Sequence, residues 1–462
     1  MSKRIPFIAA LIPIIITVSL MILTVMYLNI PLYIPLLMGF IITLITALFY
    51  GAEPKQIFIE AKKGIKSIST VFLVLLLIGV LIAIWSSSGT IDALVYYGLA
   101  IIQPEHLIIV SFLVSSAISM LLGTSVGTAS TVGIAFMGMA HSIGVNPEIV
   151  AGAIVSGAFV GDRTSPLSAV GNINTIITGT KYHDNFQELL KTLIPAMIFT
   201  ILAYWIIEHS SLQIDNESIS IVASARAELL NLYGYFSLWL LLPPLSIMVL
   251  AFLKVSIRIN LLVGSLIGAI MAYIFQERTI LDLFNYAVFG FNHPNGNIFG
   301  GGWRMFNQVL LIIISGAFYG LLEASGILAT TLHKTTERLN TAKAVIQKTM
   351  LISIFSAVLT STQVMSVIIP GKVMLKHFEE FRLKPKLLNR LIADSGMVVA
   401  GLIPWNLNAL LLGIALHVSV TDYLPYAYFL IIMPIYSYSQ TLWQYKEKGN
   451  FSKKKLAKKE EY

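Results

Sequence analysis

Apolar runs separated by short polar breaks follow one another along almost the whole chain. They fall at approximately residues 5–28, 30–50, 67–87, 106–122, 128–140, 147–160, 189–207, 233–253, 259–275, 306–331, 345–369, 388–403 and 426–442. Runs of this length predict α-helices that cross a hydrocarbon core about 30 Å thick, rather than the alternating strands of a membrane barrel. Because several runs are short or interrupted, we expect about 11 to 13 crossings together with broken helices or re-entrant hairpins. The predicted fold is an all-α polytopic membrane protein.

An internal repeat divides the chain into two halves. At one constant offset, the sequence aligns GVLIAIWSSSG (79–89) with GAFYGLLEASG (316–326), GTSVG (123–127) with TSTQV (360–364) and, after one residue of slippage, SPLS (165–168) with IPWN (403–406). The individual matches are weak, but their constant offset predicts two structurally equivalent repeats.

The charges of the loops predict that the two repeats have opposite orientations. Lysines and arginines gather in 53–66, in 371–390 and in the tail, whereas 208–231 contains several acids and a single arginine. The positive-inside rule places the basic segments and both termini in the cytoplasm, and the acidic segment outside the inner (plasma) membrane. Cytoplasmic loops of one half match external loops of the other, as in the inverted repeats of secondary transporters.

We therefore expect a single transmembrane transporter domain over residues 1–462. Its parts are N-terminal spans with a basic loop (1–66), repeat 1 (67–207), an external loop (208–231), connecting spans (232–304), repeat 2 (305–442) and a basic cytoplasmic tail (443–462).

Composition supports the membrane assignment and excludes several functions. The 462 residues are 56% hydrophobic and 12% charged, with a mean hydropathy of +0.81, and there is no cysteine for a disulfide or thiolate site. The net charge of +8 lies beside predicted spans, so we expect no nucleic-acid partner. The sequence lacks a Walker motif, a Ser/His/Asp set and metal-ligand spacing, which predicts neither an enzyme nor an ATP-driven pump, and no cofactor.

Three carboxylates fall inside apolar stretches, and acids at membrane depth usually line a cavity, pair with a base or bind an ion. They are Asp162, Glu323 and Asp394. Each also has a structural explanation: Asp162 could pair with the adjacent Arg163, Glu323 could lie at a helix end, and Asp394 could pair with Arg390 four residues earlier. A buried carboxylate balanced between desolvation and nearby dipoles can exchange a proton for Na⁺. This is the chemistry of a cation/proton antiporter.

Two stretches rich in glycine and hydroxyl residues look like helix breaks at mid-membrane. MLLGTSVGTASTVG (120–133) and its repeat partner LTSTQVMSVIIPG (359–371) would expose carbonyl and hydroxyl oxygens, which suit a small cation. Close helix packing through the GxxxG of Gly123 and Gly127 explains the first stretch equally well. Further breaks are expected at Gly161, Pro166, Gly371 and Pro404.

Five motifs in matching order resemble the NhaC family of bacterial Na⁺/H⁺ antiporters. They are LLGTSVGTASTVGIAFMGMA, GAFVGDRTSPLS, GLLEASGIL, STQVMSVIIPG, and DSGMVVAGLIPWN followed by DYLPYAYF. The resemblance implies the architecture of the ion-transporter superfamily, with inverted repeats that meet at mid-membrane in the lipid bilayer, and a possible homodimer. It also implies exchange of cytoplasmic Na⁺ for external H⁺, although one branch of the family exchanges malate for lactate.

The resemblance and the carboxylate argument together predict a transport site. We expect Asp162 and Asp394 to exchange protons for Na⁺ and to form the Na⁺ site, with Glu323 tuning or joining it. The remaining residues of the predicted ion-binding set are Thr124, Ser125, Ser165, Thr362, Gln363, Ser395 and Asn406.

Two positions depart from the NhaC pattern. An acid commonly follows SPLS in the family, whereas Ala169 stands here, and Ala400–Gly401 replaces a second Ser-Pro expected before LIPWN. Both changes remove polar ligands. They therefore affect the expected ion stoichiometry and the expectation that the transported cation is Na⁺.

Two other functions fit parts of the same sequence. On the same scaffold, Arg163 with Asn172, Asn174 and Asn406 could hold an organic anion or an amino acid, which would make the protein a carboxylate or amino-acid exchanger. A channel or a non-transporting membrane scaffold is the other class, and the inverted repeat disfavours it.

Overall fold

The computed structural model describes residues 5–28, 30–67, 69–211, 217–294, 298–337, 339–360 and 362–447. The elements of the first half are α1 (Phe7–Leu23), α2 (Tyr33–Phe49), α3 (Pro54–Ser67), α4 (Ser69–Ser87), α5 (Thr90–Ile101), α6 (Leu107–Leu122), α7 (Ser125–Thr128), α8 (Ile134–Ser142), α9 (Pro147–Thr164), α10 (Ala169–Ile177), α11 (Tyr182–Ser211) and α12 (Glu217–Tyr233). Connecting elements follow: α13 (Leu242–Phe252), α14 (Ile257–Gln276), α15 (Ile280–Phe289) and the antiparallel strands β1 (Phe291–Asn292) and β2 (Ile298–Phe299).

The second half consists of α16 (Phe306–Ala324), α17 (Ile327–Thr336), α18 (Ala342–Thr360), α19 (Met365–Glu380), α20 (Pro385–Ile392), α21 (Leu407–Leu416), α22 (Val420–Tyr423) and α23 (Tyr428–Glu447). These boundaries confirm the predicted repeat. The separation in sequence between the starts of α4 and α16 equals the separation between the starts of α5 and α17. Both separations equal the offset of the sequence alignment. The starts of α10 and α21 are one residue further apart, which reproduces the slippage.

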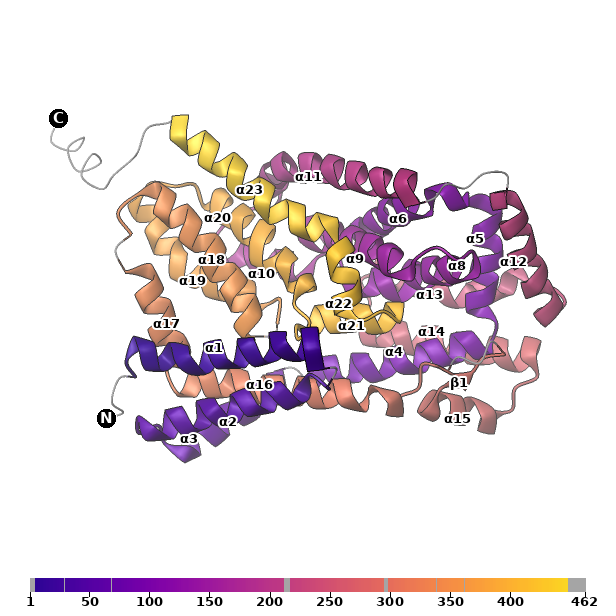
Figure 1. Cartoon of the computed structure of the whole chain (residues 1–462), viewed down its shortest axis with the longest axis horizontal. Helices are drawn as coiled ribbons and strands as arrows, with labels where there is room; N and C mark the ends of the chain where they lie inside the picture. The colour runs from indigo at the N-terminus through magenta and orange to yellow at the C-terminus, as the bar shows by residue number, and fades with distance from the viewer. Residues whose placement is uncertain are drawn as a thin grey trace.

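The two halves have opposite orientations. Helices α3 and α4 follow one another along Pro54–Ser87, and α16 packs antiparallel to them: Gly64 is in contact with Gly316, whereas Gly79 is in contact with Gly301, just before α16. In Figure 1, α17 and α19 lie at the left end of the molecule, and α5 and α12 lie at the right end. The fold is thus the predicted pair of inverted repeats.

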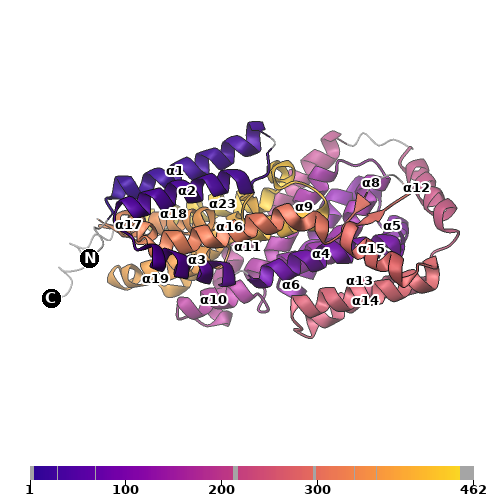
Figure 2. The ribbon, with the colours of Figure 1, turned by 90° about the horizontal axis from the view of Figure 1, so that it is seen from below.

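A helical hairpin precedes each half and packs on the other half. Helices α1 and α2 pair through Gly39 against Thr17, and α2 packs on α16. Helices α13 and α14 pair with each other, and α14 packs on α4, where Trp85 Nε1 donates a hydrogen bond of 3.1 Å to the Gly264 carbonyl. Figure 2 shows the two hairpins on opposite sides of the molecule.

Six helices among the described residues are long and apolar enough to cross a membrane, or up to eight if each of two bent pairs is one span. Four shorter apolar helices, of 10–17 residues, are also present. The number of long spans is lower than the predicted 11 to 13 crossings, because the apolar runs in the middle of each repeat are divided into short helices. The molecule is a multi-pass membrane protein.

A helix forms within 208–231, the segment expected to be an external loop. Helix α12 occupies its second part and buries Ala225 and Leu229, which are four residues apart and therefore share one face. Glu208 ends the preceding span, and its carboxylate accepts a hydrogen bond of 2.9 Å from the Ile109 backbone, at the N-terminus of α6.

Candidate functional site

The first repeat contains a helix break at Gly123. This glycine ends α6 with φ +69°, and a Cβ atom there would lie only 2.5 Å from the backbone of Leu167. Glycine is therefore required both by the left-handed conformation and by the close approach. Thr124 is extended and caps α7 by accepting a hydrogen bond from the Gly127 backbone.

The second repeat supplies the matching break and a second discontinuity. Helix α18 ends at Thr360 and α19 begins at Met365, so Thr362 and Gln363 lie in the connection. The helical segment Pro385–Leu402 meets α21 at a bend of 50°. Pro404 lies within this bend. Because proline has no backbone N–H, it cannot donate the hydrogen bond that would continue a helix.

A cavity of about 440 Å³ lies where these breaks meet. Its walls come from both repeats: the α6–α7 break, the end of α9, the start of α10, α16, the α18–α19 connection and the start of α21. Among its lining residues are Thr124, Ser125, Asp162, Tyr319, Thr362, Gln363 and Asn408. The cavity is therefore built at the interface of the halves.

Asp162 is the only carboxylate among the residues that line the cavity. It is buried near the end of α9, and its Oδ2 accepts hydrogen bonds of 3.0 Å from the Ser125 hydroxyl and from Gln363 Nε2. No base pairs with it among the described residues. Two neutral donors orient this carboxylate without neutralising it.

The amide of Gln363 is fixed by three hydrogen bonds. Its Nε2 donates to Asp162 and, at 2.9 Å, to the Met397 carbonyl, while its Oε1 accepts from Asn408 Nδ2 at 2.6 Å. These partners assign the amide nitrogen, not the oxygen, to the side facing Asp162. Gln363 therefore positions the carboxylate and does not direct a ligand oxygen at it.

Arg163, the neighbour of Asp162 in sequence, forms an ion pair with Asp394 of the other repeat. Its Nε donates to Asp394 Oδ1 at 2.7 Å, and Ser437 donates to Oδ2 at 2.7 Å. Both charged side chains are fully buried. The Thr192 hydroxyl accepts another Arg163 N–H at 2.7 Å. The pair is locally neutral and fully connected, which is how a buried ion pair is tolerated.

Comparison with known proteins identifies the family. A model of the Na⁺/H⁺ antiporter family matches residues 2–187 and 157–440. The NhaC Na⁺/H⁺ antiporter of Alkalihalophilus pseudofirmus is 32% identical over 381 residues, which are 81% of each chain. The NhaC antiporter of Bacillus subtilis is 31% identical over 421 residues, 88% of this chain and 91% of its own. The chain belongs to the NhaC family.

A family relative with a different named activity is also similar. The malate-2H⁺/Na⁺-lactate antiporter of Bacillus subtilis is 27% identical over 409 residues, 87% of this chain and 86% of its own length. The NhaC antiporters named above are thus more similar to this chain than the organic-acid exchanger is.

Half of the predicted ion-binding residues of this NhaC-family protein line the Asp162 cavity: Asp162, Thr124, Ser125, Thr362 and Gln363. The others do not line it. Asp394 pairs with Arg163, and the side chains of Ser165 and Ser395 donate hydrogen bonds to the Met120 and Leu391 carbonyls. The Asn406 side chain caps α21. Glu323 is exposed at the end of α16, four residues after Tyr319, a cavity residue.

Three of the six predicted breaks are wrong. The chain breaks at Gly123, Pro166 and Pro404, but Gly127, Gly161 and Gly371 lie inside α7, α9 and α19. Gly161 has a packing role, because a Cβ atom there would lie 2.0 Å from the Ser119 backbone of α6. Gly371 follows Pro370 within α19, and its bare backbone faces the Ile177 side chain.

Four polar residues that line the cavity are absent from the predicted ion-binding set: Ser315, Tyr319, Thr360 and Asn408. Asn408 follows the LIPWN motif by two residues, and the spacing from Asn406 was the available signal. Tyr319 lies within an apolar run and gave no signal of its own. Ala169, where the NhaC pattern has an acid, also lines the cavity.

Proposed function

We propose that the protein is a secondary antiporter that exchanges Na⁺ for H⁺, with Asp162 as the carboxylate that binds either ion. The observation that carries this proposal is a buried carboxylate, without a basic partner among the described residues, in a cavity formed by both inverted repeats. A carboxylate at this depth is stable when it binds a proton or a cation. Membership in the NhaC family supports the same activity.

Alternation between the two ions follows from the geometry. Ser125, Thr124 and Thr362 supply hydroxyl oxygens in the same cavity, which are suitable ligands for Na⁺. Because Na⁺ and H⁺ compete for one carboxylate, loading of one ion releases the other. Ser125 comes from the first repeat and Thr362 from the second, so movement of one repeat against the other changes the access to Asp162.

The second predicted carboxylate takes a different role in this proposal. Asp394 neutralises Arg163 and holds α9 against the second repeat, so a single carboxylate carries the exchanged ions. The same pairing counts against the organic-anion alternative, because the Arg163 guanidinium is already occupied by Asp394 and Thr192.

We infer the orientation from the distribution of charge. The basic segments within α3 and α19–α20 belong to the end of the molecule shown at the left of Figure 1, and the acidic α11–α12 region belongs to the opposite end. The positive-inside rule then places the left end, where α1 begins and α23 ends, in the cytoplasm of a cell whose plasma membrane holds the protein.

The test is Na⁺-induced dequenching of a pH-sensitive dye in proteoliposomes that contain the full-length protein. Wild type and the control Asp184→Asn, an exposed acid near the start of α11, should respond to Na⁺, whereas Asp162→Asn should not. A response that persists in Asp162→Asn would remove Asp162 from the mechanism. A folded wild type that responds to no alkali cation would overturn Na⁺/H⁺ exchange.

A further inference from the structure

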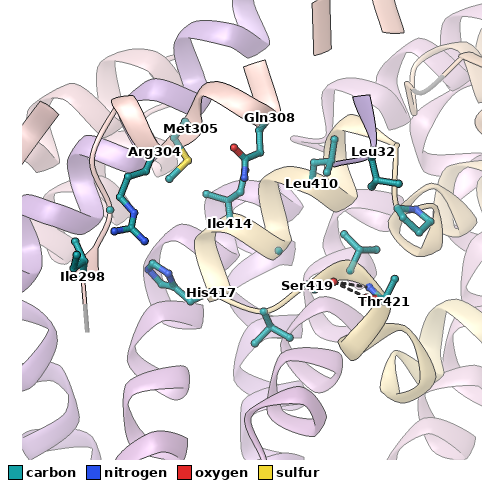
Figure 3. A pocket seen from close by; sticks show the side chains of 15 residues that line it. Leu32, Ile298, Arg304, Met305, Gln308, Leu410, Ile414, His417, Ser419 and Thr421 are labelled. Atoms are coloured by element: carbon teal, nitrogen blue, oxygen red, sulfur yellow. Dashed lines mark hydrogen bonds between the residues drawn. The ribbon is translucent and has the colours of Figure 1, made fainter. Parts of the chain in front are cut away.

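A second cavity, of about 390 Å³, shares no lining residue with the Asp162 cavity (Figure 3). The start of α21 lies between them: Leu407 and Asn408 face the Asp162 cavity, whereas Leu410 and Ile414 line the second one. The second cavity is also bounded by β2, by the turn that begins α16 and by the segment that follows α21.

The second cavity contains an unneutralised positive charge. Arg304 lines it, and no acid is among the lining residues. Within the described part of the chain, the Arg304 guanidinium makes no hydrogen bond or ion pair. Arg304 is exposed, and its planar guanidinium can bind a carboxylate through two parallel hydrogen bonds. An anion is the ligand that this charge fits.

The imidazole of His417 faces the same space. Figure 3 shows the Arg304 and His417 side chains side by side in the cavity. His417 caps α21 in the left-handed conformation, with φ +55°, and its ring packs edge-on against Phe299 at a centroid distance of 5.5 Å. His417 is exposed, and its ring makes no hydrogen bond within the described part of the chain, so its N–H can donate to a ligand.

The rest of the wall favours an organic anion. The rest of the wall is mixed: Leu32, Leu410, Ile414, Val418 and Val420 are apolar, whereas Gln308, Ser419 and Thr421 contribute polar side chains. Cavities of a few hundred cubic ångströms with apolar walls and a few convergent polar groups are typical of small-molecule sites. A hydrated inorganic ion gains nothing from these walls, whereas a short carbon chain does.

We propose that this cavity is a binding site for a small organic carboxylate. The carboxylate group lies between the Arg304 guanidinium and the His417 imidazole, and its short apolar body contacts the leucine, isoleucine and valine side chains. The site is separate from the residues proposed to exchange Na⁺ and H⁺, so its occupancy can be tested independently of transport.

The experiment is thermal unfolding of the purified full-length protein in detergent, titrated with potassium butyrate or with potassium chloride at equal concentration. Butyrate should raise the Tm of the wild type more than chloride does, and Arg304→Gln should weaken the apparent affinity at least tenfold. Arg304→Lys should retain part of the effect. The matched control is Arg258→Gln, an exposed arginine at the start of α14 that does not line the cavity.

Each outcome decides the proposal. It is overturned if butyrate does not stabilise the wild type, or if Arg304→Gln responds as the wild type does. Equal stabilisation by chloride, lost in Arg304→Gln, would show an inorganic-anion site and would overturn the organic carboxylate. Na⁺/H⁺ exchange measured on Arg304→Gln shows that the variant is folded, and its persistence separates this site from the transport site.

Discussion

Gln363 and Asp162 are 201 residues apart in sequence, and a hydrogen bond of 3.0 Å joins them across the two repeats. The donor stabilises the ionised carboxylate, so removing it favours the protonated form. We predict that Gln363→Met moves half-maximal exchange to higher pH by about one to two units, since a hydrogen bond to a charged group contributes about 1.5–3 kcal/mol and one pH unit corresponds to about 1.4 kcal/mol.

The measurement is the pH profile of Na⁺-induced dequenching. Gln347→Met is the matched control, because Gln347 is hydrogen-bonded only to Tyr438 on the exposed surface. An unchanged profile in Gln363→Met would contradict the role of Gln363 as a donor to the transport carboxylate.

The Arg163–Asp394 pair should be more important for folding than for ion binding. Removing one partner leaves an uncompensated buried charge, which costs about 3–5 kcal/mol. We predict that Arg163→Gln and Asp394→Asn each lower the Tm strongly, and that the double variant recovers most of the loss. Thermal unfolding of the four proteins measures this coupling.

The double variant also tests the role of Asp394 in transport. Exchange should return in Arg163→Gln/Asp394→Asn together with stability. A stable double variant without exchange would show that Asp394 binds the transported ion after all.

Glu323 is exposed at the end of α16, about one helical turn after the cavity residue Tyr319. An exposed carboxylate attracts cations weakly, by about 0.5–1 kcal/mol. We predict that Glu323→Gln raises the KM for Na⁺ about two- to fivefold and leaves the maximal rate unchanged. Initial rates over a range of Na⁺ concentrations separate the two parameters. A lost maximal rate would instead make Glu323 part of the ion site.

Ala169 offers a gain-of-function test. It lines the cavity in the first turn of α10, where a carboxylate is favoured by the helix dipole. We predict that Ala169→Glu adds a second acid to the site and increases the number of protons exchanged per Na⁺. The readout is the dependence of exchange on membrane potential, with Ala169→Gln as the uncharged control. Identical behaviour of the two variants would show that residue 169 does not reach the ions.

Gly161 should tolerate no side chain. A Cβ atom would approach the α6 backbone to 2.0 Å, and neither backbone can yield. We predict that Gly161→Ala abolishes the folded protein, whereas Gly171→Ala is tolerated, because the nearest atom there is the Ser168 hydroxyl at 3.2 Å. Fluorescence-detected size-exclusion chromatography compares the two. A well-folded Gly161→Ala would contradict the close packing of α6 and α9.

The repeat and the two mid-membrane breaks could be predicted from sequence because they rest on local signals. Glycine permits the left-handed conformation found at Gly123, the missing N–H of Pro404 disfavours a continuous helix, and a constant offset between matching motifs indicates duplication directly. Gly161 and Gly371 are also glycines, but a glycine inside a helix indicates close packing against a neighbouring segment. Which segment that is depends on the tertiary structure.

The partners of the carboxylates could not be predicted for the same reason. Asp162 and Asp394 look alike in sequence, since each lies in an apolar stretch with an arginine nearby. Only the fold decides that Arg163 points away from its neighbour Asp162 and toward Asp394, 231 residues later. Local spacing favoured pairs within one helix, whereas the observed ion pair joins the two repeats.

Each helical hairpin packs on the half that it does not precede, and this arrangement has a consequence for biosynthesis. The surface of α4 is covered by α14, which leaves the ribosome only after the whole first repeat, and α2 must wait for α16. The first repeat therefore cannot bury its first helix, α4, while it is the newest part of the chain. Completion of the tertiary structure is therefore a late event, and a chain truncated before α13 exposes the apolar flank of α4 to lipid or to the quality-control machinery.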